Sequence, residues 1–320
     1  MKKFVLAIFS LFILWQFTLS MATAQELLRW GTITARNPYY GLTFHVAEEK
    51  GFWKEAGLKT DWRPFRGSRL IYKGLTAGVL DVGMSTITSV IPAIARGVPI
   101  IVAADLQTKQ DFIVWVKPDS PIKKPTGLKG KTLGVTRLGG ATHAYSMVLF
   151  RSIGLENQVK IVGSGGISQA VAAFRSGKID AIIYPINTVA TLISRGHARK
   201  LVSISDYLPK ERVNIVIYPR TAIVEKKPQA MKKAIGVVLK SLNYVLAHRE
   251  WSLEKMKTVS KYNRKEAEMV FASMGAGKHG KINKKGVENA LKFLVEFGII
   301  KKDKAPPLNK IYTTQFTGEM

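Results

Sequence analysis

Short apolar runs alternate with amphipathic segments along the first part of the chain. The amphipathic segments repeat their apolar residues every three or four positions, which predicts helices, and they stop at glycines such as Gly51, Gly78 and Gly97. Between the helices we expect strands at residues 27–33, 59–65, 81–83 and 99–103. An alternation of strand and helix predicts an α/β fold with a mainly parallel sheet.

The same alternation starts again further along the chain. We expect strands at residues 131–136, 159–162 and 200–205, separated by helices that stop at glycines, among them Gly154 and Gly177. The sequence therefore predicts a second α/β lobe of similar size.

Two further apolar runs, at residues 111–116 and 213–218, are expected to carry the chain into the second lobe and back. Beyond Pro228 the pattern is helical, and these helices are expected to pack on the first lobe; they are predicted at residues 229–248, 264–273 and 284–297. The expected divisions are residues 25–115 for the first part of lobe 1, 116–213 for lobe 2, and 214–320 for the return to lobe 1.

One short unit occurs twice, as LTAGVLDVGMS at residues 75–85 and as FRSGKIDAIIYP at residues 174–185. In both copies a helix ends at a glycine, and an acid three residues later opens an apolar strand. The same interval separates Gly78 from Gly177 and Asp81 from Asp180. A glycine after the last turn readily takes the left-handed conformation that ends a helix. The repeat supports two lobes of similar construction.

Residues 1–24 have the features of a cleavable signal peptide. Lys2 and Lys3 precede an apolar region at residues 4–19, and Ala22-Thr23-Ala24 predicts cleavage before Gln25. An uncleaved anchor is the alternative, but the apolar run is short for a membrane span. The chain contains no cysteine, which excludes disulfides and a lipidated cysteine. We therefore expect a periplasmic protein.

The formal net charge of +27 raises the question of nucleic-acid binding. The lysines are scattered over predicted helix faces, and no basic strand with interleaved aromatic residues is present. We therefore expect a solvated basic surface and no nucleic-acid partner, with attraction of anionic ligands or lipid head groups as a secondary effect.

Ligands of open parallel sheets bind beyond the carboxyl ends of the strands, where loops lead into helix N-termini. Two lobes of this kind predict a ligand-binding cleft between them. The residues that we expect to line it are Asn37, Tyr39, Gly67, Ser68, Arg69, Ser85, Thr86, Arg137, Gly140, Thr142, Ser164, Tyr184 and Asn187.

Several of these residues have a purely structural alternative. A serine or threonine at a helix start can act as an N-cap, which contributes about 1 kcal/mol. Tyr39 and its neighbour Tyr40 can belong to the core, and we expect one of them to line the cleft. Arg36, Arg69 and Arg137 can each be a solvated surface residue, although a guanidinium at a strand end also suits a sulfonate or a carboxylate.

Other motifs carry less weight. Gly130-Lys131-Thr132 is similar to the end of a phosphate-binding loop, but Pro125 replaces the required glycine and the segment precedes a strand. The five histidines lack metal-ligand spacing, so no metal or cofactor is expected. His143, near a predicted helix start, is a weaker candidate for ligand contact.

Four segments, in order and at these spacings, resemble a known family: YYGLTFHVAEEKGFWKEAGLKTDW, LTAGVLDVGMS, LKGKTLGV and FRSGKIDAII. The chain is identified as similar to the periplasmic solute-binding proteins of ABC importers for sulfonates, taurine and nitrate, within a superfamily that also handles thiamine pyrimidine precursors. The resemblance covers nearly all of the chain after the signal peptide. It implies a type II periplasmic-binding fold, with a ligand clamped between two lobes by hinge closure and a closed form presented to a membrane permease.

The resulting expectation is a monomeric, non-enzymatic binding protein for a small organic solute. A sulfonate, a carboxylate or a related anion is favoured by the arginines, and an uncharged heterocycle stacked on Tyr39 or Tyr184 is the alternative. A periplasmic sensor is a second possible function. A pyrimidine-synthase-like enzyme is a third, and the absence of cysteine argues against it.

Overall fold

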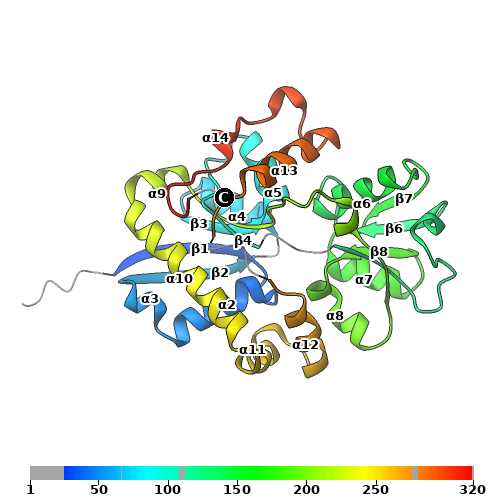
Figure 1. Ribbon diagram of the computed structural model, residues 1–320, viewed down its shortest axis with the longest axis horizontal. Helices are drawn as coiled ribbons and strands as arrows, with labels where there is room; N and C mark the ends of the chain where they lie inside the picture. Colours follow the sequence, from blue (N-terminus) through cyan, green and yellow to red (C-terminus); the bar gives the residue numbers. More distant parts are fainter. Residues whose placement is uncertain (1–24, 66, 108–111, 276–279, 319–320) are drawn as a thin grey trace, which may run out of the picture.

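The computed structural model describes residues 25–65, 67–107, 112–275 and 280–318. The chain forms two α/β lobes that lie side by side, each built on a five-stranded sheet (Figure 1). The expected signal peptide at residues 1–24 lies outside the described residues.

The sheet of the first lobe has the order β2-β1-β3-β10-β4. β1 is parallel to β2 and β3, whereas β10 is antiparallel to both of its neighbours. The strands of this sheet are β1 (Glu26–Ile33), β2 (Leu58–Phe65), β3 (Val82–Thr86), β4 (Ala104–Gln107) and β10 (Ile215–Pro219).

The sheet of the second lobe repeats this arrangement in the order β7-β6-β8-β5-β9, with β5 as its antiparallel strand. Its strands are β5 (Ile113–Val116), β6 (Thr132–Val135), β7 (Lys160–Gly163), β8 (Ala181–Tyr184) and β9 (Arg199–Ser203). In each lobe, the antiparallel strand is the one that follows a crossing between lobes. The predicted α/β fold with two mainly parallel sheets is confirmed.

Two expected boundaries differ from the structure. All of β5 pairs within the second sheet, so the sheets divide between β4 and β5, a few residues before the expected division at 115/116. The strand expected at residues 99–103 forms only single bridges, from Ile100 to Arg220 and from Val102 to Tyr312. The continuous strand begins later, at Ala104, although Ile101 and Ala103 already donate backbone hydrogen bonds to Pro219 and Ile217 of β10, at 3.1 and 2.8 Å.

The helices cover both faces of each sheet (Figure 1). They are α2 (Pro38–Glu49), α3 (Phe52–Glu55), α4 (Ser68–Thr76), α5 (Ile87–Ala95), α6 (Ala141–Ser152), α7 (Ile167–Arg175), α8 (Ile186–Ser194), α9 (Thr221–Lys226), α10 (Pro228–Ala247), α11 (Arg249–Lys255), α12 (Arg264–Ala272), α13 (Lys284–Glu296) and α14 (Leu308–Ile311). Single helical turns occupy η1 (Pro125–Leu128), η2 (Ile204–Tyr207), η3 (Met256–Ser260) and η4 (Lys302–Lys304).

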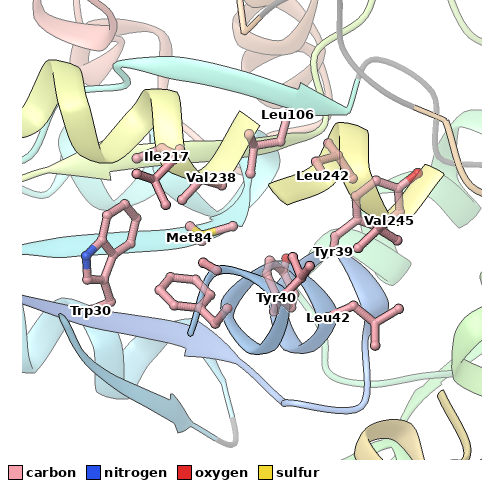
Figure 2. Close-up of a cluster of buried hydrophobic side chains, with 14 of the residues drawn as sticks. Trp30, Tyr39, Tyr40, Leu42, Met84, Leu106, Ile217, Val238, Leu242 and Val245 are labelled. Carbon is pink, nitrogen blue, oxygen red and sulfur yellow. The ribbon is translucent and has the colours of Figure 1, made fainter. Parts of the chain in front are cut away.

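The core of the first lobe has two layers, because alternate residues of a strand point to opposite faces of the sheet. Ile217 of β10 packs with Trp30, Met84 and Val238 under α2 and α10 (Figure 2). Tyr218, the next residue, packs on the other face under α4 and α5. The predicted docking of C-terminal helices on the first lobe is confirmed, since α10 packs on α2, and α13 on α5.

The duplicated unit is also confirmed. Gly78 and Gly177 have φ angles of 73° and 79° and end α4 and α7. The Asp81 carboxylate accepts a hydrogen bond from the backbone N–H of Arg29 at 3.0 Å, and Asp180 does the same for Thr132 at 2.8 Å. Each acid therefore ties the start of its own strand to the neighbouring parallel strand.

Candidate functional site

The carboxyl ends of the parallel strands in each lobe are directed toward the other lobe. The chain leaves the first sheet from the end of β4, and it leaves the second sheet from the end of β9 through η2. Because β4 and β9 run parallel to most strands of their sheets, the turns that follow those strands lie on the side between the lobes. This is the edge at which open α/β sheets bind ligands.

The two connections between the lobes are joined to each other at their first-lobe ends. Asn214 donates from its backbone N–H to the Gln107 carbonyl and from Nδ2 to Gln107 Oε1, both at 2.9 Å. A pair of adjacent crossing segments is the arrangement expected of a hinge.

The tyrosines after β1 are core residues. Tyr39 and Tyr40 are each 3% exposed and pack in the core of the first lobe, which is the structural alternative considered for them. The Tyr39 hydroxyl donates to the Gly275 carbonyl at 2.6 Å, and burial raises the pKa of Tyr39 to about 12. Asn37 caps α2, since its side chain accepts from the Tyr39 N–H at 3.0 Å.

Ser85 does not begin a helix, contrary to expectation. It lies within β3, which continues through Thr86 because Thr86 pairs with Ile215 of β10. Ser85 is fully buried and donates to the Tyr218 hydroxyl at 2.9 Å. Thr86 is half-buried and directly precedes α5. Ser85 therefore serves the core, and Thr86 remains at the edge between the lobes.

At the start of α4, Gly67 is the residue before the helix, Ser68 is buried, and Arg69 is exposed. The equivalent turn of the second lobe places the half-buried Ser164 before α7. These four residues lie at the predicted edge, and only Arg69 among them carries charge.

The turn between β6 and α6 is held together by side chains that we had expected to contact ligand. Thr142 Oγ1 accepts from the Thr136 N–H at 3.0 Å, and the Thr136 hydroxyl donates to the buried Tyr184 hydroxyl at 3.1 Å. Arg137 in the same turn is exposed, and Gly140 precedes α6. Thr142 and Tyr184 therefore position the turn.

His143 accepts a hydrogen bond at Nδ1 from the Gly139 N–H at 3.2 Å. Burial lowers its pKa from the ordinary value of 6.5, because a buried site disfavours the charged ring. This hydrogen bond gives His143 a local structural role in the β6–α6 turn.

Six helices begin at this edge: α2, which Asn37 caps, and α4 to α8, which have no side-chain N-cap. The capping role considered for Ser68, Thr86 and Thr142 is therefore not observed. Asparagine caps do occur on α2, α12 and α13. Uncapped first-turn N–H groups and the helix dipole make a helix start favourable for negative charge.

The lobes contact each other along α8 and α12. The Tyr262 hydroxyl donates to the Asn187 carbonyl, and Ser194 Oγ donates to Glu266 Oε1 at 2.9 Å. Arg36 is exposed, lies 5.7 Å from the centre of the Tyr262 ring and donates from Nε to the Ser260 carbonyl at 3.0 Å. Tyr262 thus contacts both Arg36 of the first lobe and Asn187 of the second. No sequence pattern indicated that Tyr262 would bridge the lobes.

A second contact between the lobes involves α6 and α13. The rings of Tyr145 and Phe293 stack at 5.8 Å, and Arg151 pairs with Glu296 at 2.7 Å. A cavity of about 310 Å³ lies here, lined by α6, α13 and the return connection. None of the thirteen expected ligand-binding residues lines it. Sequence reasoning missed it because α13 is remote from α6 in the chain.

A comparison of the sequence with known families supports this architecture. The family model described as NMT1/THI5 like matches residues 39–251, which is more than half of the chain. The chain belongs to the NMT1/THI5-like family.

Curated relatives of this NMT1/THI5-like protein include proteins that carry the name "Putative binding protein" in Brucella abortus, Brucella suis and Brucella melitensis. Each is 28% identical over 232 residues, which is 70% of this chain. The chain spans 66% of the length of those relatives, just under two thirds.

Solved structures share the fold of this NMT1/THI5-like protein. The periplasmic aliphatic sulphonate binding protein SsuA of Escherichia coli has a TM-score of 0.78 at 17% identity, over 91% of this chain and 99% of that one. The alkanesulfonate-binding protein SsuA of Xanthomonas axonopodis has a TM-score of 0.76 at 15% identity, over 89% and 98%. The periplasmic nitrate-binding protein NrtA of Synechocystis has a TM-score of 0.70 at 12% identity, over 91% and 86%. The predicted periplasmic-binding fold is confirmed.

Within the described residues, no helix is both long enough and apolar enough to cross a membrane.

Proposed function

We propose that this NMT1/THI5-like protein is the periplasmic solute-binding component of an ABC importer. It captures a small organic solute between its lobes and presents the closed form to a membrane permease. The observation that carries the proposal is the pair of facing sheet edges, joined by two adjacent connections. Such a site lets one ligand touch both lobes, and a ligand favours closure only through contacts that differ between the open and closed forms.

An anionic solute, such as a sulfonate or carboxylate, fits the uncapped helix starts of this edge. It also agrees with the names of the solved relatives, which are sulphonate- and nitrate-binding proteins. In this proposal, the residues at the edge that remain available to a ligand are Gly67, Arg69, Thr86, Arg137, Gly140, Ser164 and Asn187. The protein acts without catalysis, as a monomer and without a cofactor.

The experiment is a thermal melt of protein purified from the periplasmic fraction, against sulfonates, nitrate, carboxylates and pyrimidines. A solute present at about 100 times its Kd stabilises the folded state by about 2.7 kcal/mol, which raises Tm by several degrees. We expect a shift with one class of anion. Recovery of the protein only from the cytoplasm, or a melt that no solute changes after ligand removal under denaturing conditions and refolding, would contradict the proposal.

The alternative functions make different predictions. A sensor binds solute equally well, but deletion of its gene leaves uptake of the radiolabelled solute intact. A pyrimidine-synthase-like enzyme releases a product that mass spectrometry detects. For an importer component, deletion of the gene abolishes uptake of the solute, and the bound solute is released chemically unchanged.

A further inference from the structure

The cavity between α6 and α13 has a charged side chain in its wall. Arg212, on the return connection, is half-buried, and its Nε and Nη1 atoms are enclosed without a hydrogen-bond partner in the part of the chain that the structure describes. An enclosed guanidinium N–H that has lost water and found no acceptor is costly, since the desolvation of a charged donor is uncompensated. An acceptor supplied by a ligand removes that cost.

The acidic residues around the cavity leave Arg212 without an ion pair. Glu296 pairs with Arg151 at 2.7 Å. Glu211 is exposed, and its backbone carbonyl accepts from Asn289 Nδ2 at 3.0 Å. The other cation in the lining, Lys292, is exposed on α13. The charge of Arg212 is therefore available to a group inside the cavity.

Polar groups of both lobes surround this charge. Burial raises the pKa of Tyr145 to about 12, while the nearby positive charge of Arg212 and a hydrogen bond with Thr88 act in the opposite direction. Tyr145 lies on α6 of the second lobe, and Thr88 lies in the first turn of α5 of the first. The guanidinium thus shares the cavity with a hydrogen-bonded pair of hydroxyl groups, one of which can also donate to an anion.

The rest of the wall is largely apolar and aromatic. Tyr145 and Phe293 stack with ring centres 5.8 Å apart, and Phe297 follows at 5.1 Å from Phe293. The volume of about 310 Å³ lies at the lower end of the range for small-molecule pockets. A small molecule with an apolar body and one charged group matches such a wall.

We propose that this cavity binds an organic anion, a carboxylate or sulfonate on a small apolar body, and that Arg212 binds its charged group. The proposal rests on the proposed solute-binding function and places the charged contact outside the six strand-to-helix turns of the sheet edges. Arg36, another arginine considered for the anion, already donates to the Ser260 carbonyl and lies against the Tyr262 ring. Because the walls belong to both lobes, the bound anion links α6 to α13 and favours closure.

Calorimetry with three probes tests this inference: benzenesulfonate, benzoate and the uncharged benzenesulfonamide. The variants are Arg212→Gln, which removes the charge, Arg212→Lys, which keeps it, and Arg175→Gln, a matched loss of charge at an exposed arginine at the end of α7, outside the cavity lining. We expect the protein to bind at least one anion and to bind the sulfonamide at least tenfold more weakly. Arg212→Gln lowers affinity for that anion by about 10- to 100-fold, Arg212→Lys by less, and Arg175→Gln by no more than about twofold.

A melt without probe separates this role from a structural one. A ligand-binding arginine without internal partners leaves Tm unchanged or raises it when replaced by Gln, whereas a structural arginine lowers it. Unchanged anion affinity in Arg212→Gln overturns the proposal, as does preference for the sulfonamide or a lack of binding by all three probes. Native mass spectrometry of the protein as purified then tests the proposed solute-binding function separately. A co-purified solute supports that function even if the Arg212 site is wrong. The absence of a co-purified solute, together with no melt shift, contradicts both the function and the Arg212 site.

Discussion

At the scale of single residues, Asp81 is the charged centre of the first lobe. Its side chain is 5% exposed and accepts from Arg29 Nε and Nη2, both at 2.8 Å, and from Arg220 Nη2 at 3.2 Å. Burial alone raises the pKa of Asp81, but the hydrogen bonds from Arg29 and Arg220 outweigh burial and lower it below the ordinary value of 3.8. Asp81 therefore stabilises the folded state in its charged form.

We expect Asp81→Asn to lower the free energy of unfolding by about 3 kcal/mol at pH 7. This is the low end of the range for breaking a buried pair, because Arg29 and Arg220 are 37% and 22% exposed and keep some water. A group with a lowered folded pKa contributes fully above its unfolded pKa and loses the contribution as pH falls through the folded value. The difference in the free energy of unfolding between wild type and variant should thus be constant from about pH 6 to 8 and should become smaller below about pH 4. Urea denaturation at a series of pH values measures it.

Asp180→Asn is the matched control. Asp180 occupies the same place in the repeat, but Thr132 stands beside it where Arg29 stands beside Asp81. An asparagine Oδ1 can still accept from the Thr132 N–H, so this variant removes only the negative charge of the acceptor and costs at most about 1 kcal/mol. Equal losses for the two variants would show that the arginines add nothing to the contribution of Asp81.

At the scale of elements, α12 acts as a contact between the lobes as well as part of the first. Asn263 and Glu266 form a capping box at its start. The same Glu266 side chain accepts from Ser194 on α8, and Tyr262, just before α12, donates to Asn187. The capped end of α12 is therefore the part that meets the second lobe. Glu266 takes part in both the capping box and the contact with Ser194, so the cap holds the side chain that makes the contact.

We expect Tyr262→Phe to loosen this contact without unfolding either lobe. It removes one hydrogen bond, worth about 1 kcal/mol, which corresponds to about a fivefold change in the balance between closed and open arrangements. Small-angle X-ray scattering of the solute-free variant should give a larger radius of gyration than wild type. Tyr244→Phe is the control, because the Tyr244 ring packs against His248 and Trp251 within the first lobe. An identical radius in Tyr262→Phe and wild type would rule out this contact as a determinant of closure.

At the scale of the whole molecule, the formal charge of +27 acts on the rate of encounter. A positive field attracts an anionic solute from a distance, and dissolved salt screens that field with a Debye length of about 10 Å at 0.1 M. Contacts inside an enclosed cavity are screened much less. Association and dissociation should therefore respond differently to salt.

We expect the association rate of benzenesulfonate to fall severalfold between about 20 and 200 mM NaCl, with little change in the dissociation rate. Stopped-flow tryptophan fluorescence measures both rates. Lys292→Glu, an exposed position in the cavity lining, should lower the association rate further, whereas Lys240→Glu on α10, already paired with Glu55, serves as the distant control. Salt that acted only on dissociation would contradict steering by the net charge.

Much of the architecture could be predicted because its causes are local. The glycines at 78 and 177 end helices through their own backbone freedom, and the apolar runs identify strands wherever both faces of a sheet are covered. The ligand site could be predicted only in part. Strand ends locate the edge between the lobes, but burial then assigns Tyr39, Tyr40, Ser85, Thr142 and Tyr184 to the core or to turns.

The sequence by itself therefore determined two repeated α/β lobes, their two crossings and the edge at which they meet, since periodicity and glycine stops act within a few residues. Only the tertiary structure decided which side chains are buried and which line the edge and the cavity between the lobes. Arg212 became a candidate because α6 and α13, far apart in the chain, close a cavity around it, and Tyr262 became a bridge because α12 reaches α8. Such contacts depend on how distant segments pack, and residue type and spacing do not encode that packing locally.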